Sequence, residues 1–192
     1  MKSPLILASA SPRRKELLER IGLDFSVIPS KIEEKKVSGE TPVAYALRQA
    51  TDKALEVSKR YPSRLVLGAD TIVVLDREVF GKPYDHQTAR RMLRRLNGRE
   101  HTVITAFVLV FKEKELLVRH WVETQVKMKP LTEGRIERYL GTGEPFDKAG
   151  GYAIQGKGTL LVESIQGCYT NVMGLPLPTL ADALQEIGIN IF

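Results

Sequence analysis

Two long strand-like segments joined by a short charged turn place the strongest limit on how this chain can fold. They cover residues 101–111 and 115–129, and the turn at 112–114 consists of two lysines and a glutamate. The second segment alternates, with Val118, Val122, Val126 and Met128 on one face and Arg119, Glu123, Gln125 and Lys127 on the other. Such alternation is typical of an antiparallel strand with one solvated face. The sheet must therefore contain an antiparallel hairpin.

Upstream of this hairpin, predicted helices and strands alternate, which favours parallel pairing. Two helix starts are marked by a capping hydroxyl and a proline, at Ser11-Pro12 and Thr41-Pro42. We predict strands over residues 5–8, 25–28, 64–68, 71–75 and 160–165, and helices over 12–21, 41–60, 85–96, 132–140 and 178–187. Early alternation followed by a hairpin predicts an α/β fold with a mixed sheet.

Length and composition limit the remaining choices. A chain of 192 residues suits one domain, or two lobes that share a cleft. The single cysteine, Cys168, excludes an internal disulfide, and the three histidines are too scattered to form a zinc site. The apolar run near residue 5 is too short for a signal peptide, and no stretch approaches a membrane span. We therefore expect a soluble cytoplasmic protein with no membrane partner.

The net charge of +6 indicates an anionic partner, either a nucleic acid or a phosphorylated small molecule. A basic surface that serves only solubility is the alternative. The position of the charges decides between these readings, and the segment Ser9-Ala10-Ser11-Pro12-Arg13-Arg14 is informative here. Two arginines in the first turn of a helix oppose its dipole, unless an anion binds at that end. An ordinary capped helix with solvated arginines remains the alternative.

An isolated carboxylate, Asp70, lies between the apolar runs 65–67 and 72–74. A carboxylate at the edge of a core is costly unless it is hydrogen-bonded, paired or bound to a metal. A simple aspartate turn between two strands is the other interpretation. Glu34, in a polar loop beside Glu33, could supply a second oxygen ligand, since Mg²⁺ takes one or two protein carboxylates together with phosphate oxygens. Otherwise these glutamates are solvated loop residues.

Several lysines occupy constrained positions. Lys82 lies between a glycine and a proline, and Lys53 lies in a predicted helix beside Ala50 and Ala54, although a solvated helix lysine is the default for Lys53. The segment 144–156 includes Lys148 and has the mixed composition of a binding loop. Phosphoryl chemistry requires cations, isolated carboxylates and an anion-binding site, and the sequence offers all three. Neither a P-loop nor a Gly-x-Gly-x-x-Gly motif is present.

Five motifs, in order along nearly the whole chain, closely resemble those of the Maf family of nucleoside triphosphate pyrophosphatases. They are Leu7-Ala8-Ser9-Ala10-Ser11-Pro12-Arg13-Arg14, Gly68-Ala69-Asp70-Thr71, Gly81-Lys82-Pro83, the run from Asp147 to Gly156, and Asn171-Val172-Met173-Gly174-Leu175-Pro176-Leu177. The resemblance implies one domain over residues 1–192, with an elongated mixed sheet and two lobes around a deep cleft, as in inosine triphosphate pyrophosphatases. It also implies hydrolysis of a nucleoside triphosphate to the monophosphate and pyrophosphate.

The resemblance carries over to individual residues. It implies a divalent cation, Mg²⁺ or Mn²⁺, held by Asp70 and Glu34, with Asp70 as the catalytic residue, either as general base or as metal ligand. The implied substrate-binding residues are Ser9, Arg13, Arg14, Lys53, Thr71, Lys82 and Gln155. Among these, Arg13, Thr71 and Gln155 match the subgroup that acts on dTTP and UTP, where a 7-methyl-GTP subgroup has Trp, Gln and Glu.

The family is also linked to inhibition of septum formation, which raises a competing function. A protein that binds nucleic acid or a division partner would suit the positive charge. However, the basic residues of the motifs alternate with carboxylates and glycines, and the 7% aromatic content offers no stacking platform for bases. We therefore expect an enzyme in nucleotide metabolism whose partner is its triphosphate substrate, with a role in nucleotide house-cleaning or division arrest as an implication of the resemblance. The sequence is compatible with a homodimer.

Overall fold

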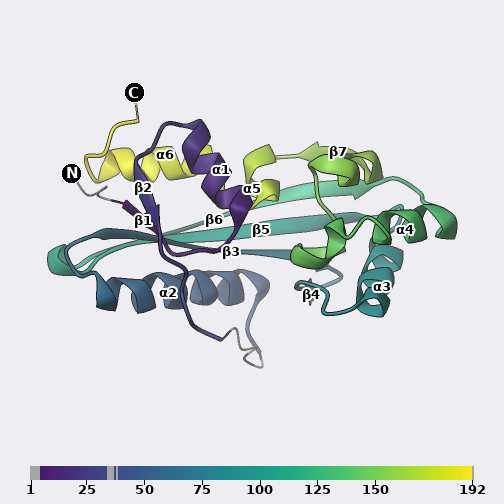
Figure 1. The fold of residues 1–192 in the computed structure, drawn as a ribbon, viewed down its shortest axis with the longest axis horizontal. Helices are drawn as coiled ribbons and strands as arrows, with labels where there is room; N and C mark the ends of the chain where they lie inside the picture. Colours follow the sequence, from purple (N-terminus) through teal and green to yellow (C-terminus); the bar gives the residue numbers. More distant parts are fainter. Residues whose placement is uncertain (1–4, 34–36, 38, 192) are drawn as a thin grey trace.

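The computed structural model describes residues 5–33, 37 and 39–191, and its centre is a mixed seven-stranded sheet (Figure 1). The strand order is β2-β1-β3-β5-β6-β7, and β4 pairs with β3 outside this path. The strands are β1 (Leu5–Leu7), β2 (Phe25–Val27), β3 (Leu65–Leu75), β4 (Glu78–Phe80), β5 (Glu100–Phe111), β6 (Leu116–Met128) and β7 (Val162–Gln166). Strand β1 runs parallel to β2 and β3, whereas β3, β5, β6 and β7 pair antiparallel. The prediction of an α/β fold with a mixed sheet is confirmed.

Helices cover both faces of this sheet. They are α1 (Pro12–Arg20), α2 (Pro42–Arg60), α3 (His86–Leu96), α4 (Glu133–Leu140), α5 (Tyr169–Met173) and α6 (Leu177–Glu186). In Figure 1, α2 lies along one face, α1, α5 and α6 lie on the opposite face, and α3 and α4 lie near one end of the sheet. Alternate residues of the central strands therefore enter different cores, with Phe107 facing α1 and α6 while Ala106 faces α2. No helix in the described ranges has the length and apolar character to cross a membrane.

Three of the predicted helix starts carry a side-chain cap. The hydroxyls of Thr41 and Thr132 and the carboxylate of Asp85 accept hydrogen bonds from backbone N–H groups in the first turn. Ser11 occupies the capping position of α1 but makes no such bond with its side chain, so its predicted cap is wrong in this respect. Its own N–H instead donates to Ser9 Oγ at 3.2 Å. The chain before α1 is thus shaped by Ser9.

The two strand-like runs on either side of Asp70 form one continuous strand, β3, so the predicted break and the aspartate turn are wrong. Gly68 explains the misleading signal. An added Cβ at Gly68 would lie 2.8 Å from the Cβ of Ala54 on α2, so only glycine permits the close contact between strand and helix. The glycine therefore reports helix packing, and Asp70 lies in the middle of the sheet.

Candidate active site

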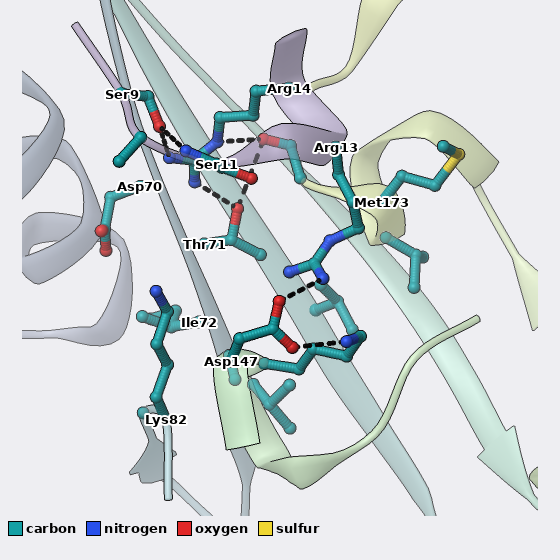
Figure 2. A pocket seen from close by; sticks show the side chains of 18 of the residues that line it. Ser9, Ser11, Arg13, Arg14, Asp70, Thr71, Ile72, Lys82, Asp147 and Met173 are labelled. Atoms are coloured by element: carbon teal, nitrogen blue, oxygen red, sulfur yellow. Dashed lines mark hydrogen bonds and ion pairs between the residues drawn. The ribbon is translucent and has the colours of Figure 1, made fainter. Parts of the chain in front are cut away.

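A pocket of about 410 Å³ opens between the start of α1, the centre of β3 and the loop after α4 (Figure 2). The structure brings eight of the nine predicted site residues together in the lining of this pocket: Ser9, Arg13, Arg14, Lys53, Asp70, Thr71, Lys82 and Gln155. The ninth, Glu34, lies outside the described residues. Asp147 and Lys148 also line the pocket. Figure 2 shows Asp70 and Lys82 on one side of the pocket, with Arg13 and Asp147 across from them.

Asp70 is a buried carboxylate with a cationic partner. Only 6% of the residue is exposed, and its Oδ1 atom lies 2.6 Å from Nζ of Lys53, which projects from α2. Desolvation of a carboxylate is costly, and a hydrogen-bonded ammonium offsets that cost. Lys53 is thus not a solvated helix lysine. The pair places a buried carboxylate in a pocket whose charged lining residues are mostly cations.

Arg14 and Arg13 are neighbours with different surroundings. The Arg14 guanidinium is buried and donates to Gly174 O at 2.8 Å, Ser9 Oγ at 3.0 Å, Ala69 O at 2.9 Å and Thr71 Oγ1 at 3.0 Å. It therefore joins the loop after β1, the middle of β3 and the end of α5. Arg13 projects into the mouth of the pocket, where its Nη1 atom lies 3.4 Å from Oδ2 of Asp147.

Asp147 connects Arg13 to the loop after α4. Lys148 Nζ donates to Asp147 Oδ1 at 2.5 Å and to the carbonyl oxygen of Glu144 at 2.7 Å. Burial alone would raise the pKa of Asp147, but the hydrogen bond and charge of Lys148, followed by the charge of Arg13, hold that pKa below its usual range. Asp147 is therefore an anion that pairs with two cations of the pocket, Arg13 and Lys148. The sequence signal for it was its place beside Lys148 in the predicted binding loop.

Lys82 and Gln155 present polar groups without a fixed protein partner. Lys82 is exposed, and within residues 5–33, 37 and 39–191 its ammonium makes no hydrogen bond or ion pair. Gln155 is half-buried, and its side chain makes no hydrogen bond to the described part of the chain. The alternative that Gln155 ties the glycine-rich loop together through backbone hydrogen bonds therefore gains no support from these contacts.

A different residue, Glu144, fastens the glycine-rich loop. Its carboxylate accepts hydrogen bonds from Tyr139 OH at 3.0 Å and from the N–H groups of Lys157 at 3.0 Å and Gly158 at 2.8 Å. The Tyr139 hydroxyl in turn accepts from the N–H of Ala153 at 3.1 Å. The loop that carries Gln155 is thus held from both sides. Sequence reasoning treated Glu144 only as part of a binding loop and did not identify this role.

A buried, hydrogen-bonded pair of side chains, Tyr152 and His101, supports the same loop. Tyr152 lines the pocket, and its hydroxyl shares a 2.6 Å hydrogen bond with Nε2 of His101 on β5. The two rings meet edge to face with centroids 5.3 Å apart. Burial lowers the pKa of His101 to about 4, so the imidazole is neutral at pH 7. This neutral pair fixes one wall of the pocket without adding charge.

The donor set is compatible with a divalent cation that shares its coordination with substrate. The described residues contain no cluster of three or more histidine, cysteine, aspartate or glutamate side chains that could hold a metal without other ligands. One buried carboxylate, Asp70, does face the pocket. Mg²⁺ characteristically takes one or two carboxylates and completes its shell with phosphate oxygens and water, so this set fits such an ion.

The mixed sheet and this pocket define an α/β protein with a cationic ligand cleft that contains one buried carboxylate. The comparisons with known proteins narrow the class. A family model described as "Maf-like protein" matches residues 4–187. The chain belongs to the Maf family.

Several relatives match almost their full length. The chain is 49% identical to a protein of Clostridioides difficile over 98% of this chain and 97% of the relative. It is 48% identical to one of Gloeobacter violaceus, with 98% of each chain covered, and 46% identical to one of Geotalea uraniireducens, with 97% and 96% covered. Each of these relatives is named a dTTP/UTP pyrophosphatase. Among solved structures, the Staphylococcus aureus Ham1 protein matches with a TM-score of 0.43 and 13% identity over 65% of this chain and 71% of that one.

Proposed function

We propose that the protein is a dTTP/UTP pyrophosphatase, which hydrolyses these nucleotides to the monophosphate and pyrophosphate. The near full-length relatives of that name support this activity. The observation that carries it is the buried Asp70–Lys53 pair, because it sets one basic oxygen among the cations of the pocket. Triphosphate hydrolysis requires both a group that directs water and charges that neutralise phosphate.

In this mechanism Asp70 positions a water molecule for attack on the α-phosphorus and accepts its proton. A bond forms between the water oxygen and the α-phosphorus, while the bond from that phosphorus to the bridging oxygen breaks and pyrophosphate leaves. Lys53 donates to the other carboxylate oxygen and so holds the Asp70 carboxylate in place before the attack. Arg13 and Lys82 lie where they can neutralise the triphosphate, and Arg14 holds the surrounding segments in place.

Asp70 and Glu34 would hold a divalent cation, Mg²⁺ or Mn²⁺, which would supply further neutralisation of phosphate charge. The two possible tasks of Asp70, proton acceptor and ligand, draw on the same carboxylate. A buried carboxylate beside several pocket cations suits either task. Activity measured against the concentration of each metal chloride after chelator treatment tests the requirement.

We also propose that the whole chain forms a single domain with two lobes around this cleft, and that it works on the nucleotide pool of the cytoplasm. Residues that line the pocket run from Ala8 to Gly174, so the site draws on nearly all of the chain. A fragment that folded by itself would lack part of this lining, which supports a single domain.

The reaction is tested directly by incubating the protein with a panel of nucleoside triphosphates and Mg²⁺ or Mn²⁺, followed by ion-exchange separation of the products. UTP and dTTP should yield UMP or dTMP together with pyrophosphate. Release of orthophosphate and a diphosphate would contradict cleavage at the α-phosphorus. Absence of turnover with every nucleotide would instead favour a protein that acts by binding nucleic acid or a division partner.

Lys82→Ala should raise the KM of every triphosphate substrate by roughly tenfold, because a charge-assisted phosphate contact contributes about 1.5–3 kcal/mol and the contact does not depend on the base. The measurement compares UTP with a purine triphosphate. Lys157→Ala is the matched control, since Lys157 is an exposed lysine of a neighbouring loop outside the pocket lining. Unchanged kinetics in Lys82→Ala would show that this lysine is an ordinary loop residue.

Gln155→Glu should lower kcat/KM for UTP and dTTP by about 5- to 150-fold more than for other nucleotides. A glutamine amide offers a donor and an acceptor that match the N3–H and a carbonyl of uracil or thymine, and a carboxylate loses the donor. Glu144 and Tyr139 hold the backbone of the loop on both sides of Gln155 and so fix where its side chain starts. Steady-state kinetics on UTP, CTP and GTP, with a melting curve, check this expectation. An equal loss on all substrates, together with a lower melting temperature, would assign Gln155 a structural role.

A further inference from the structure

A second pocket lies beside the active site and shares the segment around Lys82 with it. It has a volume of about 320 Å³ and opens between β4, the loop after β4 and one face of α3. Its polar lining residues are Glu78, Lys82, Tyr84, Thr88, Arg91 and Arg95. Val79, Gly81 and Lys82 line the active-site pocket as well, so the two pockets are neighbours along this segment.

The backbone of the shared segment is fixed, whereas the Lys82 side chain is free. The carbonyl oxygen of Gly81 accepts a hydrogen bond from the N–H of Gly150 at 3.0 Å, and Pro83 is buried. Figure 2 shows the Lys82 side chain pointing into the active-site pocket, where its ammonium makes no hydrogen bond or ion pair with the described residues. Because lysine has a flexible four-carbon stem, this ammonium can follow an anion from the active-site pocket into the second pocket.

Arg91 is a cation of the second pocket that no described carboxylate neutralises. Its neighbours on α3, Arg90 and Arg94, form ion pairs with glutamates of α4. Arg95 lines the pocket, but it pairs at 3.0 Å with Glu78, the carboxylate of this lining. Arg91 itself forms no ion pair within residues 5–33, 37 and 39–191. Its charge therefore remains available to an anion.

The groups around Arg91 contact it without neutralising its charge. Hydrogen bonds with the side chain of Thr88, and then with Arg91, lower the pKa of the Tyr84 hydroxyl, and this tyrosine is 82% exposed. Hydrogen bonds from Thr88, followed by the charge of Arg91, lower the pKa of Asp85, whose carboxylate caps α3 at 2.6 Å from the N–H of Thr88. The helix start thus engages this carboxylate. An anion in the pocket would meet Arg91 and the Tyr84 hydroxyl together.

We propose that the second pocket binds inorganic pyrophosphate, the leaving group of the proposed reaction, and the inference rests on that proposed function. Lys82 lines both pockets and is the residue proposed to contact the triphosphate, so the phosphate product is the one that it brings to the second pocket. There Arg91 presents a planar fork of N–H donors, which suits phosphate oxygens. No bond forms or breaks in this transfer.

Direct binding is tested by titration calorimetry of the unmodified chain with sodium pyrophosphate, in the absence of nucleotide. Two binding events are expected, one among the active-site cations and one in the second pocket. Arg91→Gln should weaken one of them by about tenfold or more, because a charge-assisted contact to phosphate is lost. Arg138→Gln alters an exposed arginine of α4 outside both linings and should bind as the unmodified chain does. Equal isotherms for the unmodified chain and Arg91→Gln would overturn the proposal, as would a loss confined to the binding of UMP.

Product inhibition tests the same site during turnover. Pyrophosphate in the second pocket blocks departure of the next leaving group, so it should lower the maximal rate at saturating UTP. Arg91→Gln should raise the constant for this inhibition by about tenfold, while kcat/KM for UTP stays within about twofold, since that ratio does not include product release. Purely competitive inhibition of the unmodified chain would overturn the proposed route. Absence of UTP hydrolysis would refute the proposed function instead, whereas a calorimetric difference between the unmodified chain and Arg91→Gln would still support a pyrophosphate site.

Discussion

Asp70→Asn should lower kcat for UTP by about 10²-fold or more while the protein stays folded. The amide preserves the shape of the carboxylate and can still accept the hydrogen bond from Lys53. It cannot accept a proton from water, and it is a much weaker ligand for a divalent cation. Single-turnover rates measured with saturating UTP separate this loss from any change in binding.

An exposed aspartate provides the matched control for this change. Asp24→Asn alters the same functional group on the surface, outside the pocket lining, and should leave kcat unchanged. Near-normal turnover in a folded Asp70→Asn protein would refute the proposed role of Asp70 in catalysis. A large loss that accompanies a lower melting temperature would call for the same measurement below the unfolding transition.

Arg14→Lys should destabilise the fold by about 2–4 kcal/mol, because a buried acceptor left without a donor costs about 1–3 kcal/mol. The Arg14 guanidinium donates hydrogen bonds to Gly174 O, to Ala69 O and to two hydroxyls at once. The ammonium of a lysine, on a shorter side chain with three donors, cannot reach all four acceptors. For a chain of this size the melting temperature should fall by roughly 5–15 °C. Differential scanning calorimetry measures the change.

The neighbouring arginine supplies the comparison. Arg13→Lys keeps the charge at the pocket mouth, where the one ion pair of Arg13 within the described ranges is a long contact with the exposed Asp147. Its effect on the melting temperature should be within about 1–2 °C, since exposed ion pairs contribute little to stability. If the two variants lose equal stability, the assignment of a structural role to Arg14 and a substrate-binding role to Arg13 is wrong.

The sequence predicted the features that depend on residues a few positions apart in the chain. The helix boundaries at Thr41, Asp85 and Thr132 follow from local capping, and the alternation along β6 follows from one solvated face. The predicted break at Asp70 was wrong, because a glycine two residues before an aspartate resembles a turn. Only the helix packed against Gly68 reveals why the glycine is there. The short strand β4 and the short helix α5, of three and five residues, were not predicted.

The pocket itself could be assembled from motifs, but the partners of its residues could not. Lys53 and Asp70 are 17 positions apart, and no local pattern links a helix lysine to a strand aspartate. The substrate-facing interpretation of Arg14 came from its place in the first motif, whereas its carbonyl and hydroxyl partners come from β3 and from the end of α5. Glu144 escaped notice for the same reason, because its acceptors serve a loop that is irregular in sequence.

The hydrogen bond from Arg14 to the carbonyl oxygen of Gly174 joins residues 160 positions apart, and both line the pocket. During synthesis the ribosome releases the chain from its N-terminal end, so the helix start with its arginines is exposed long before its final acceptor exists. The pocket lining is therefore complete only after residue 174 has emerged. A nascent or prematurely terminated chain that ends before residue 174 would hold the first four motifs, yet Arg14 would lack one of its acceptors and the pocket would lack one wall.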